Sequence, residues 1–187
     1  MPLELTQTAE PTTAVAPSSD YAEAMSVLAS GVVMVTTELA GRPWGVTVSA
    51  FASVSAEPPT VLVSLDSATA AARAIAEAGS FGVSILGRQH GAAARHGSRR
   101  GAPKFLERFV DRHADDVNPA VAGALAHLDC EVVEEVEAGD HTIVIARVRE
   151  VRRTRCGEPL VYFRRAYCTL IEHGRPSIGR RTPCLSS

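Results

Sequence analysis

The chain has 187 residues, a length that fits one domain better than two. Apolar residues make up 45% of it and aromatic residues only 5%, so Ala, Val, Leu and Ile must do most of the core packing. The formal net charge of −2 gives no sign of a nucleic-acid or membrane-surface partner, and no apolar run approaches the roughly 20 residues of a membrane span.

The two ends of the chain differ in composition from its middle. Residues 1–19 are rich in Thr, Pro and Ala and lack the basic and apolar regions of a secretion signal, so we expect a disordered segment and a cytoplasmic protein. One folded domain is expected over 20–171, followed by a loose tail over 172–187. The four cysteines contain no C-x-x-C pair, which predicts reduced thiols and no metal site.

The first expected elements are a helix and two strands. Asp20 can cap a helix that Gly31 ends. Residues 32–38 are β-branched and predict a strand. Residues 44–55 alternate cleanly and predict a long second strand, which Pro58 and Pro59 stop because proline cannot donate to a ladder.

The rest of the chain is dominated by strands. We expect strands at 60–65, 81–86, 128–136, 141–153 and 160–170, a helix at 68–78 capped by Ser67, and short helices at most over 87–118. About seven strands, two or three helices and two closing hairpins predict a mainly β fold, an antiparallel β-barrel with a few helices. Neither G-x-G-x-x-G after a strand nor a P-loop occurs.

One face of the strand at 44–55 carries hydroxyls and no charge. Thr47, Ser49, Ser53 and Ser55 share that face. Small neutral hydroxyls both donate and accept hydrogen bonds, which suits a polar, planar, mostly neutral ligand. A plain β-surface is the alternative, because Thr favours strands.

The strand at 60–65 runs into a predicted helix start that carries more hydroxyls. Ser64, Ser67 and Thr69 stand where the free N–H groups and positive dipole end of a helix could cradle a phosphate. In the alternative, Ser67 is only an N-cap.

Three further features could contact a ligand. His141 follows a Gly139-Asp140 hairpin turn that does not itself require a histidine. Arg165 and Tyr167 share a face of the last strand, although an exposed arginine pair also protects an edge strand. The basic residues at 95–100 with Lys104 could hold a dinucleotide's phosphates, or form a solvated loop. Neither a carboxylate pair nor a Ser-His-Asp order is evident.

Six segments, taken in order, resemble the flavin reductase family with the FMN-binding split-barrel fold. They are AMSVLASGVV (24–33), GVTVSAFASVS (45–55), PPTVLVSLD (58–66), GSFGVSIL (79–86), GDHTI (139–143) and PLVYFRRAY (159–167). Members of this family are the reductase components of two-component flavin monooxygenases. The family often has Asn where Ser84 stands, and Arg-Phe-Ala where residues 95–97 are Arg-His-Gly.

The resemblance implies a set of cofactor contacts. It implies that two stretches of the 44–55 strand line the flavin, that the turn at 64–69 holds its phosphate, that Phe81 and Lys104-Phe105 lie near the rest of the cofactor, that His141 faces the nicotinamide, and that Tyr167 closes that side. The expected site residues are Thr47, Val48, Ser49, Ala50, Ser53, Val54, Ser55, Ser64, Leu65, Asp66, Ser67, Thr69, Phe81, Lys104, Phe105, His141, Arg165 and Tyr167.

The function implied is that of an NAD(P)H:flavin oxidoreductase. A hydride would pass from NADH, or alternatively NADPH, to FAD or FMN, with FAD slightly preferred, and the reduced flavin would go to a separate monooxygenase. The family resemblance also implies a homodimer. The alternatives are a non-catalytic flavin carrier or sensor and a related split-barrel oxidase.

Overall fold

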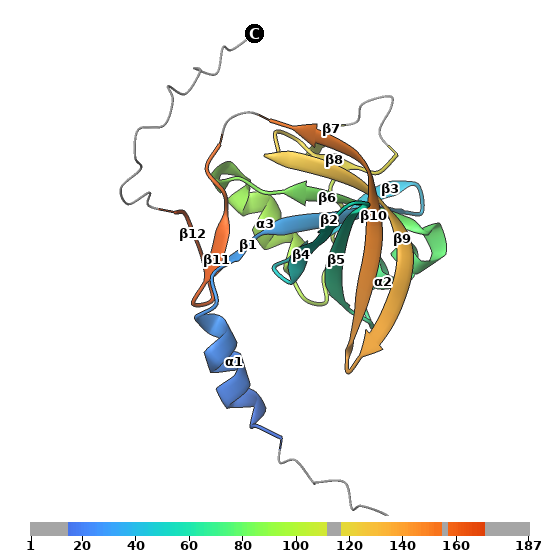
Figure 1. Ribbon diagram of the computed structural model, residues 1–187. Coiled ribbons are helices and arrows are strands. Elements are labelled where there is room, and N and C mark those ends of the chain that lie inside the picture. Colours follow the sequence, from blue (N-terminus) through green and yellow to red (C-terminus); the bar gives the residue numbers. More distant parts are fainter. Residues whose placement is uncertain (1–14, 112–116, 155–156, 171–187) are drawn as a thin grey trace, which may run out of the picture.

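A computed structural model describes residues 15–111, 117–154 and 157–170. Within these ranges seven strands form one antiparallel sheet, in the order β3-β2-β6-β9-β10-β5-β4 (Figure 1). Their bounds are β2 (Val33–Leu39), β3 (Arg42–Val48), β4 (Phe51–Ala56), β5 (Pro59–Asp66), β6 (Ser80–Ile85), β9 (Ala126–Ala138) and β10 (His141–Arg153). The prediction of a mainly β, antiparallel fold is confirmed.

Smaller elements surround the main sheet. The helices are α1 (Ser18–Ser26), α2 (Ala70–Ala78), the 3₁₀ turn η1 (Arg88–His90) and α3 (Gly91–Gly97). A three-stranded sheet joins β1 (Ser30–Gly31), β11 (Val161–Phe163) and β12 (Ala166–Cys168), and a two-stranded sheet joins β7 (Val110–Asp111) to β8 (Ala120–Val121). No helix in the described ranges is long and apolar enough to cross a membrane.

The main sheet curls because its two edge strands are neighbours in the chain. β3 and β4 lie at opposite edges, yet only Ser49 and Ala50 separate them. Three Cα steps span at most about 11 Å, whereas seven flat strands would hold the edges about 29 Å apart. The edges must therefore meet at this corner, where Ser64 N–H donates to Ala50 O over 3.0 Å.

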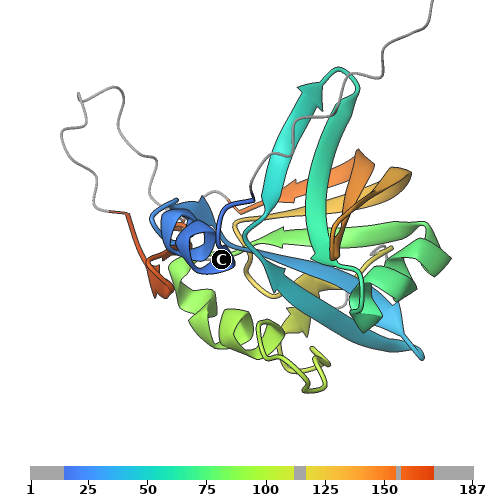
Figure 2. The ribbon, with the colours of Figure 1, turned by 90° about the horizontal axis from the view of Figure 1, so that it is seen from below.

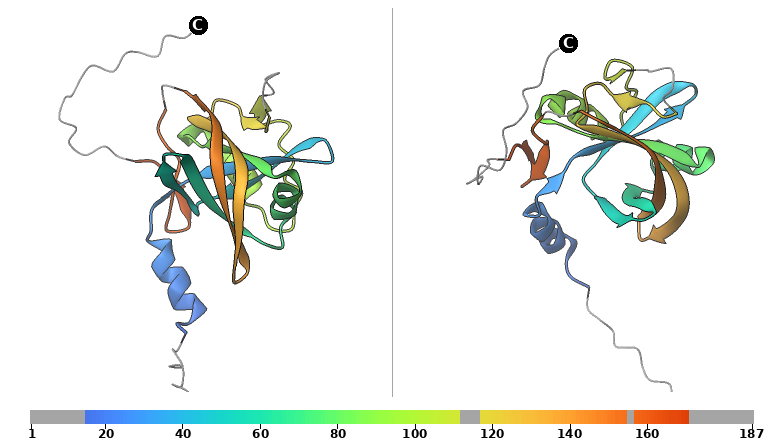
Figure 3. Two further views of the ribbon diagram at one scale, coloured as in Figure 1. Left: turned by 45° about the vertical axis from the view of Figure 1, so that its right-hand side comes forward. Right: turned by 45° about the horizontal axis from the view of Figure 1, so that its top comes forward.

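Away from the corner the barrel stays open. Figure 2 shows the β4–β5 hairpin rising away from β2 and β3, and the right-hand view in Figure 3 shows the rest of the sheet curving around the interior. The barrel is therefore split rather than closed, as the family resemblance implied.

Two predicted strands are in fact broken. The strand expected over 44–55 ends as β3 at Val48 and resumes as β4 at Phe51, because the chain turns the corner between the sheet edges. The strand expected over 160–170 is the hairpin of β11 and β12, whose turn holds Arg164 and Arg165 at φ values of 47° and 62°. Arg165 is therefore a turn residue and does not share a strand face with Tyr167.

The core has two parts, one on each face of β2. Inside the barrel, Val33 and Val35 pack with Phe81 and with Ile75 of α2. On the outer face, Met34 packs beneath α3. The first core is built mainly from Val, as the scarcity of aromatic residues predicted.

Two helix starts differ from the prediction. α1 begins at Ser18, before Asp20, and has no buried residue; Figure 1 shows it standing away from the barrel. α2 is capped by Thr69 and not by Ser67: Thr69 Oγ1 accepts Ala72 N–H at 3.2 Å. Gly79 ends α2 as expected, with φ of 65°. The terminal segments 1–14 and 171–187 lie outside the described residues.

Candidate active site

An open cavity of about 900 Å³ lies beside the corner between β3 and β4. Its walls come from the corner itself, the β5–α2 turn, the end of α3 with residues 98–104, the start of β10, and the β11–β12 hairpin. Its volume lies within the range of small-molecule and cofactor sites.

Most of the residues singled out from the sequence line this one cavity. They are Thr47, Val48, Ser49, Ala50, Ser64, Leu65, Asp66, Thr69, Lys104, His141, Arg165 and Tyr167. The fold thus brings together three segments that are far apart in the sequence: the corner, the β5–α2 turn and the hairpin tip at His141.

Six expected residues lie elsewhere. Ser53, Val54 and Ser55 belong to β4, which leaves the cavity beyond the corner. Phe81 is fully buried in the barrel core, on β6. Phe105 lies behind the cavity wall, where its ring meets Trp44 edge-on at 4.8 Å.

Ser67, the sixth, stabilises the site without lining it. Its hydroxyl is 2.8 Å from Thr142 Oγ1, and its N–H donates to Asp140 O over 3.1 Å. These two hydrogen bonds tie the β5–α2 turn to the start of β10, which carries His141. Ser67 therefore joins two walls of the cavity.

The β5–α2 turn is organised by Asp66 and Thr69. Asp66 O accepts both Thr69 N–H at 3.1 Å and Thr69 Oγ1–H at 2.8 Å, and Asp66 Oδ1 accepts Ala68 N–H at 2.9 Å. Ala70 and Ala71 begin α2 and line the cavity. The N–H groups of a first helical turn have no partner within the helix, so this wall suits an anionic group.

Two cations line the cavity near this turn. Lys104 is half-buried, and loss of hydration lowers the pKa of its ammonium group, while the nearby Asp66 opposes and Arg100 reinforces that shift. Arg100 is exposed at the rim. A helix start, a desolvated lysine and an arginine together fit a phosphate-bearing ligand.

His141 is held at the rim by its neighbour. Its Nδ1 lies 2.7 Å from Asp140 Oδ1, and this hydrogen bond holds the pKa of the Asp140 carboxyl below its usual range. With Nδ1–H donating to Asp140, Nε2 is the nitrogen left for a ligand. His141 pairs with Asp66 in the sheet, so it stands next to the phosphate-type wall.

The corner residues supply the floor. Val48 is buried, whereas Ser49 and Ala50 are exposed to the cavity. The Thr47 hydroxyl donates to Ala94 O over 2.8 Å, so it anchors α3 to β3. Small side chains with few charges leave room for a planar ring.

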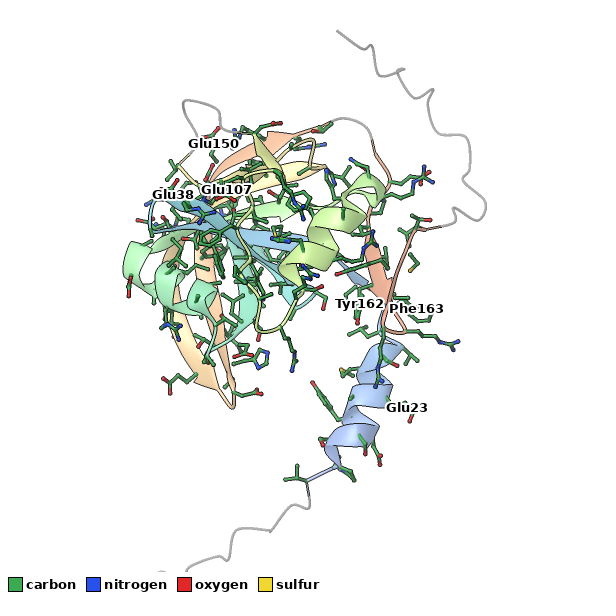
Figure 4. All side chains as sticks on the ribbon, turned by 180° about the vertical axis from the view of Figure 1, so that it is seen from behind. Glu23, Glu38, Glu107, Glu150, Tyr162 and Phe163 are labelled. Atoms are coloured by element: carbon green, nitrogen blue, oxygen red, sulfur yellow. The ribbon has the colours of Figure 1, made fainter. Side chains whose placement is uncertain are left out.

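Sequence reasoning missed part of the lining. Trp44 and Val46 sit on the strand face opposite the hydroxyls, and Tyr162 packs against Tyr167 with ring centroids 5.5 Å apart. Figure 4 shows Tyr162 on β11, close to the end of α1. Trp44 and Val46 are both partly buried, and Val46 packs against the barrel core as well as lining the cavity.

The basic cluster at 95–100 is divided between two cavities. Arg100 lines the first. Arg95 lines a second groove of about 370 Å³ together with Arg88. Tyr167 lines both, so the two hollows are neighbours.

The described ranges offer no accessible Ser-His-Asp group, reactive buried thiol or metal site. Ser84 Oγ lies 3.0 Å from His127 Nδ1, and His127 Nε2 lies 3.6 Å from Asp129 Oδ1, but all three residues are buried and no substrate reaches them. Burial raises the pKa of the Cys130 thiol to about 12, which keeps it protonated. The described residues contain no group of His, Cys, Asp or Glu placed to hold a metal.

Comparisons with known proteins identify the family of this chain. A family model described as "Flavin reductase like domain" matches residues 25–170. The reductase component of 4-nitrophenol 4-monooxygenase/4-nitrocatechol 2-monooxygenase of Rhodococcus opacus is 37% identical over 146 residues, which cover 78% of this chain and 77% of that protein. An NADH-dependent flavin reductase of a Rhodococcus species is 36% identical over 156 residues, covering 82% of this chain and 86% of that protein.

Solved structures give the same result. BorF, the flavin reductase component of a bacterial two-component tryptophan halogenase, superposes with a TM-score of 0.76 at 30% identity and covers 84% of this chain and 100% of its own. The NADH:FAD oxidoreductase SgcE6 of Streptomyces globisporus, in complex with NAD and FAD fragments, gives 0.73 at 26% identity, with 89% and 100% covered. The chain belongs to the flavin reductase family.

Proposed function

We propose that this chain reduces FMN or FAD with NADH and supplies the reduced flavin to a separate monooxygenase. The observation that carries the proposal is the single cavity that combines the start of α2, Lys104 and His141. The names of its relatives, reductase components and an NADH-dependent flavin reductase, support the same activity.

The fit of the cavity to a flavin rests on three of its walls. Ala70 and Ala71 at the start of α2, with Lys104, would bind the phosphate through N–H groups and a positive charge. Ser49 and Ser64 would hydrogen-bond polar edges of the ring, and Trp44, Val46 and Leu65 would cover its apolar parts. When bound, the flavin supplies the hydride acceptor and the reduced nicotinamide supplies the hydride.

The protein's own part is to bind, orient and exclude water. His141 Nε2 would accept a hydrogen bond from the nicotinamide carboxamide, while Asp140 holds the opposite ring nitrogen. Tyr167 and Arg165 would close the nicotinamide side. Apart from Asp66, which accepts Ala68 N–H, no carboxylate is among the described residues that line the cavity. We assign His141 a hydrogen-bonding role, because the hydride passes directly between the two cofactors and needs no proton from the protein.

The choice between FAD and FMN depends on the cations in the cavity, and the choice of NADH rests on the relatives' names. Arg100 extends the positive charge of Lys104 toward the rim, which supports FAD, because its pyrophosphate carries one phosphate group more than FMN. NADH is proposed as the reductant, as the relatives' names state, with NADPH as an alternative substrate.

We also propose a cytoplasmic homodimer. Cys130 and Cys168 are free, which suits a reducing compartment. Tyr21, Met25 and Leu28 form an exposed apolar stripe on and just after α1, and Val54 of edge strand β4 is exposed too. Such a stripe on a helix that stands off the barrel fits burial against a second copy of the chain.

The activity is tested with the purified chain, NADH and added FMN or FAD. We expect flavin-dependent loss of NADH absorbance; its absence with both flavins would contradict the proposal. In His141→Ala we expect the KM for NADH to rise by about three- to tenfold, the effect of losing one hydrogen bond, with less than a twofold change in flavin affinity. Equal losses of both would show that His141 does not face the nicotinamide.

A further inference from the structure

Residues 104–106, here called the Lys104 wall because Lys104 lines the cavity, are held against β3 by an antiparallel bridge between Phe105 and Trp44. Gly45 N–H donates to Lys104 O over 3.1 Å, and Leu106 N–H donates to Pro43 O over 2.8 Å. Gly45 allows this close approach, because a Cβ there would come within 2.3 Å of Leu106 Cδ1 unless that side chain shifted. The Lys104 wall therefore lies directly along the edge of β3.

The outer side of the Lys104 wall is held by His96. In a strand, successive carbonyls point to opposite sides, so Phe105 O faces away from β3. His96 Nε2–H donates to this carbonyl over 2.9 Å, and the imidazole ring lies 5.4 Å from the ring of Phe109. His96 Nδ1 has no hydrogen-bond partner among the described residues. Within these residues, the imidazole therefore forms its hydrogen bond through Nε2, to Phe105 O.

The helix that carries His96 is itself fixed to the barrel. Thr47 Oγ1–H donates to Ala94 O, two residues before His96. Gly97 lies so close to β3 that a Cβ there would come within 2.4 Å of Thr47 Oγ1. The Lys104 wall is thus clamped between β3 on one side and an anchored α3 on the other.

We propose that His96 is a positioning residue for Lys104. By holding Phe105 O, it fixes the position of the Lys104 wall relative to the cavity, so that the Lys104 ammonium group can contact the flavin phosphate. Lysine is a flexible point charge, and its placement depends on the backbone that carries it. The inference rests on the proposed flavin site and adds a residue that does not line the cavity.

The test compares two flavins that differ only in the phosphate. FMN and riboflavin are titrated against the native chain and His96→Phe, with binding followed by flavin fluorescence. Phe keeps the ring packing and removes the N–H. We expect the Kd for FMN to rise about fivefold, as for the loss of one hydrogen bond, and the Kd for riboflavin to stay within about twofold. Equal changes for both flavins would overturn the proposal.

A conservative replacement and a double variant complete the test. His96→Gln can donate from its amide in place of Nε2–H, so FMN affinity should return to within about twofold of native. In a Lys104→Met background, His96→Phe should no longer affect FMN selectively. If Gln loses as much as Phe, or if the effect persists without Lys104, His96 does not act through Lys104.

The proposed function and this inference fail in different ways. If Lys104→Met weakens FMN and riboflavin equally, Lys104 does not meet the phosphate and the proposed site is wrong. If Lys104→Met is selective for FMN but His96→Phe is not, only the positioning role of His96 is wrong. Thermal unfolding of each variant shows that the compared proteins are folded.

Discussion

The ionisation of Lys104 depends on its burial in the cavity wall. Its ammonium group is half-buried, and loss of hydration lowers its pKa from the ordinary lysine value. A bound phosphate would favour the charged form and raise the pKa again. Flavin binding is therefore linked to protonation of Lys104.

The sign of this linkage gives a prediction. Below the lowered pKa, Lys104 is already charged and FMN affinity should not vary with pH on its account. Above it, binding must take up a proton, so the affinity should fall by up to about tenfold per pH unit. Fluorescence titrations across the alkaline range measure this, with riboflavin as the control that shares the ring.

Two variants check the assignment to Lys104. Lys104→Met should bind FMN more weakly at neutral pH and lose the excess pH dependence over riboflavin. Lys104→Arg should keep its charge throughout and show a flat profile. A native profile that is equally steep for FMN and riboflavin would rule out Lys104 as the titrating group.

Unlike Lys104, Phe81 does not line the cavity, although the family resemblance implied that it lies near the cofactor. It is fully buried on β6, inside the barrel core. Phe81→Ala should lower the free energy of unfolding by about 3–5 kcal/mol, measured by urea denaturation, because it leaves a cavity in the packed core. The folded fraction should bind FMN within about twofold of native, since a residue away from the cavity contributes little to binding. A selective loss of flavin affinity at native stability would place Phe81 at the site instead.

At the scale of elements, the β5–α2 turn and the start of β10 behave as one unit. Ser67 makes this link through Thr142 Oγ1 and Asp140 O, although its position before a helix suggested a cap or a phosphate ligand. The cap is Thr69, two residues later, which is still extended and directly precedes the first helical residue, Ala70. The tie aligns His141 with the wall that would hold the phosphate.

A double-mutant cycle tests that tie. Ser67→Ala and Thr142→Val should each destabilise the fold slightly, with a coupling of about 0.5–1 kcal/mol, because each removes the same hydrogen bond. Ser67→Ala should weaken FMN and riboflavin equally. A loss confined to FMN would mean that the Ser67 hydroxyl contacts the phosphate after all.

For the whole molecule, α1 is the exposed surface on which the proposed dimer depends. The helix has no buried residue, and Tyr21 and Leu28 are about 60% exposed (63% and 60%) on and just after it. Its contact with the rest of the chain includes the hydrogen bond from Arg164 N–H to Ser26 O, at the β11–β12 turn that lines the cavity. A partner that covers α1 would therefore also steady one wall of the site.

Light scattering coupled to size-exclusion chromatography tests the dimer. We expect the native chain to elute with the mass of two copies. Met25→Lys with Leu28→Lys should shift it toward one copy, because each places a charge in an apolar contact. An exposed control, Glu77→Lys on α2, should leave the mass unchanged. A native monomer would contradict the proposal.

Local patterns determined much of this protein. The β-branched strands, the β9–β10 hairpin with its Gly139-Asp140 turn, and the end of α2 at Gly79 were all predicted from the sequence, because each depends on neighbouring residues. The ordered segments also predicted the family and the split barrel.

The tertiary structure decided where those elements meet. Alternation continues unchanged through Ser49 and Ala50, so no local signal marks the corner that sends Ser49 to the cavity and Ser53 away from it. The same long-range pairing buries Phe81, turns Ser67 toward Thr142 and sets His96 against the Lys104 wall. A period-two pattern specifies which residues share a face, but only the pairing of distant strands specifies what that face meets.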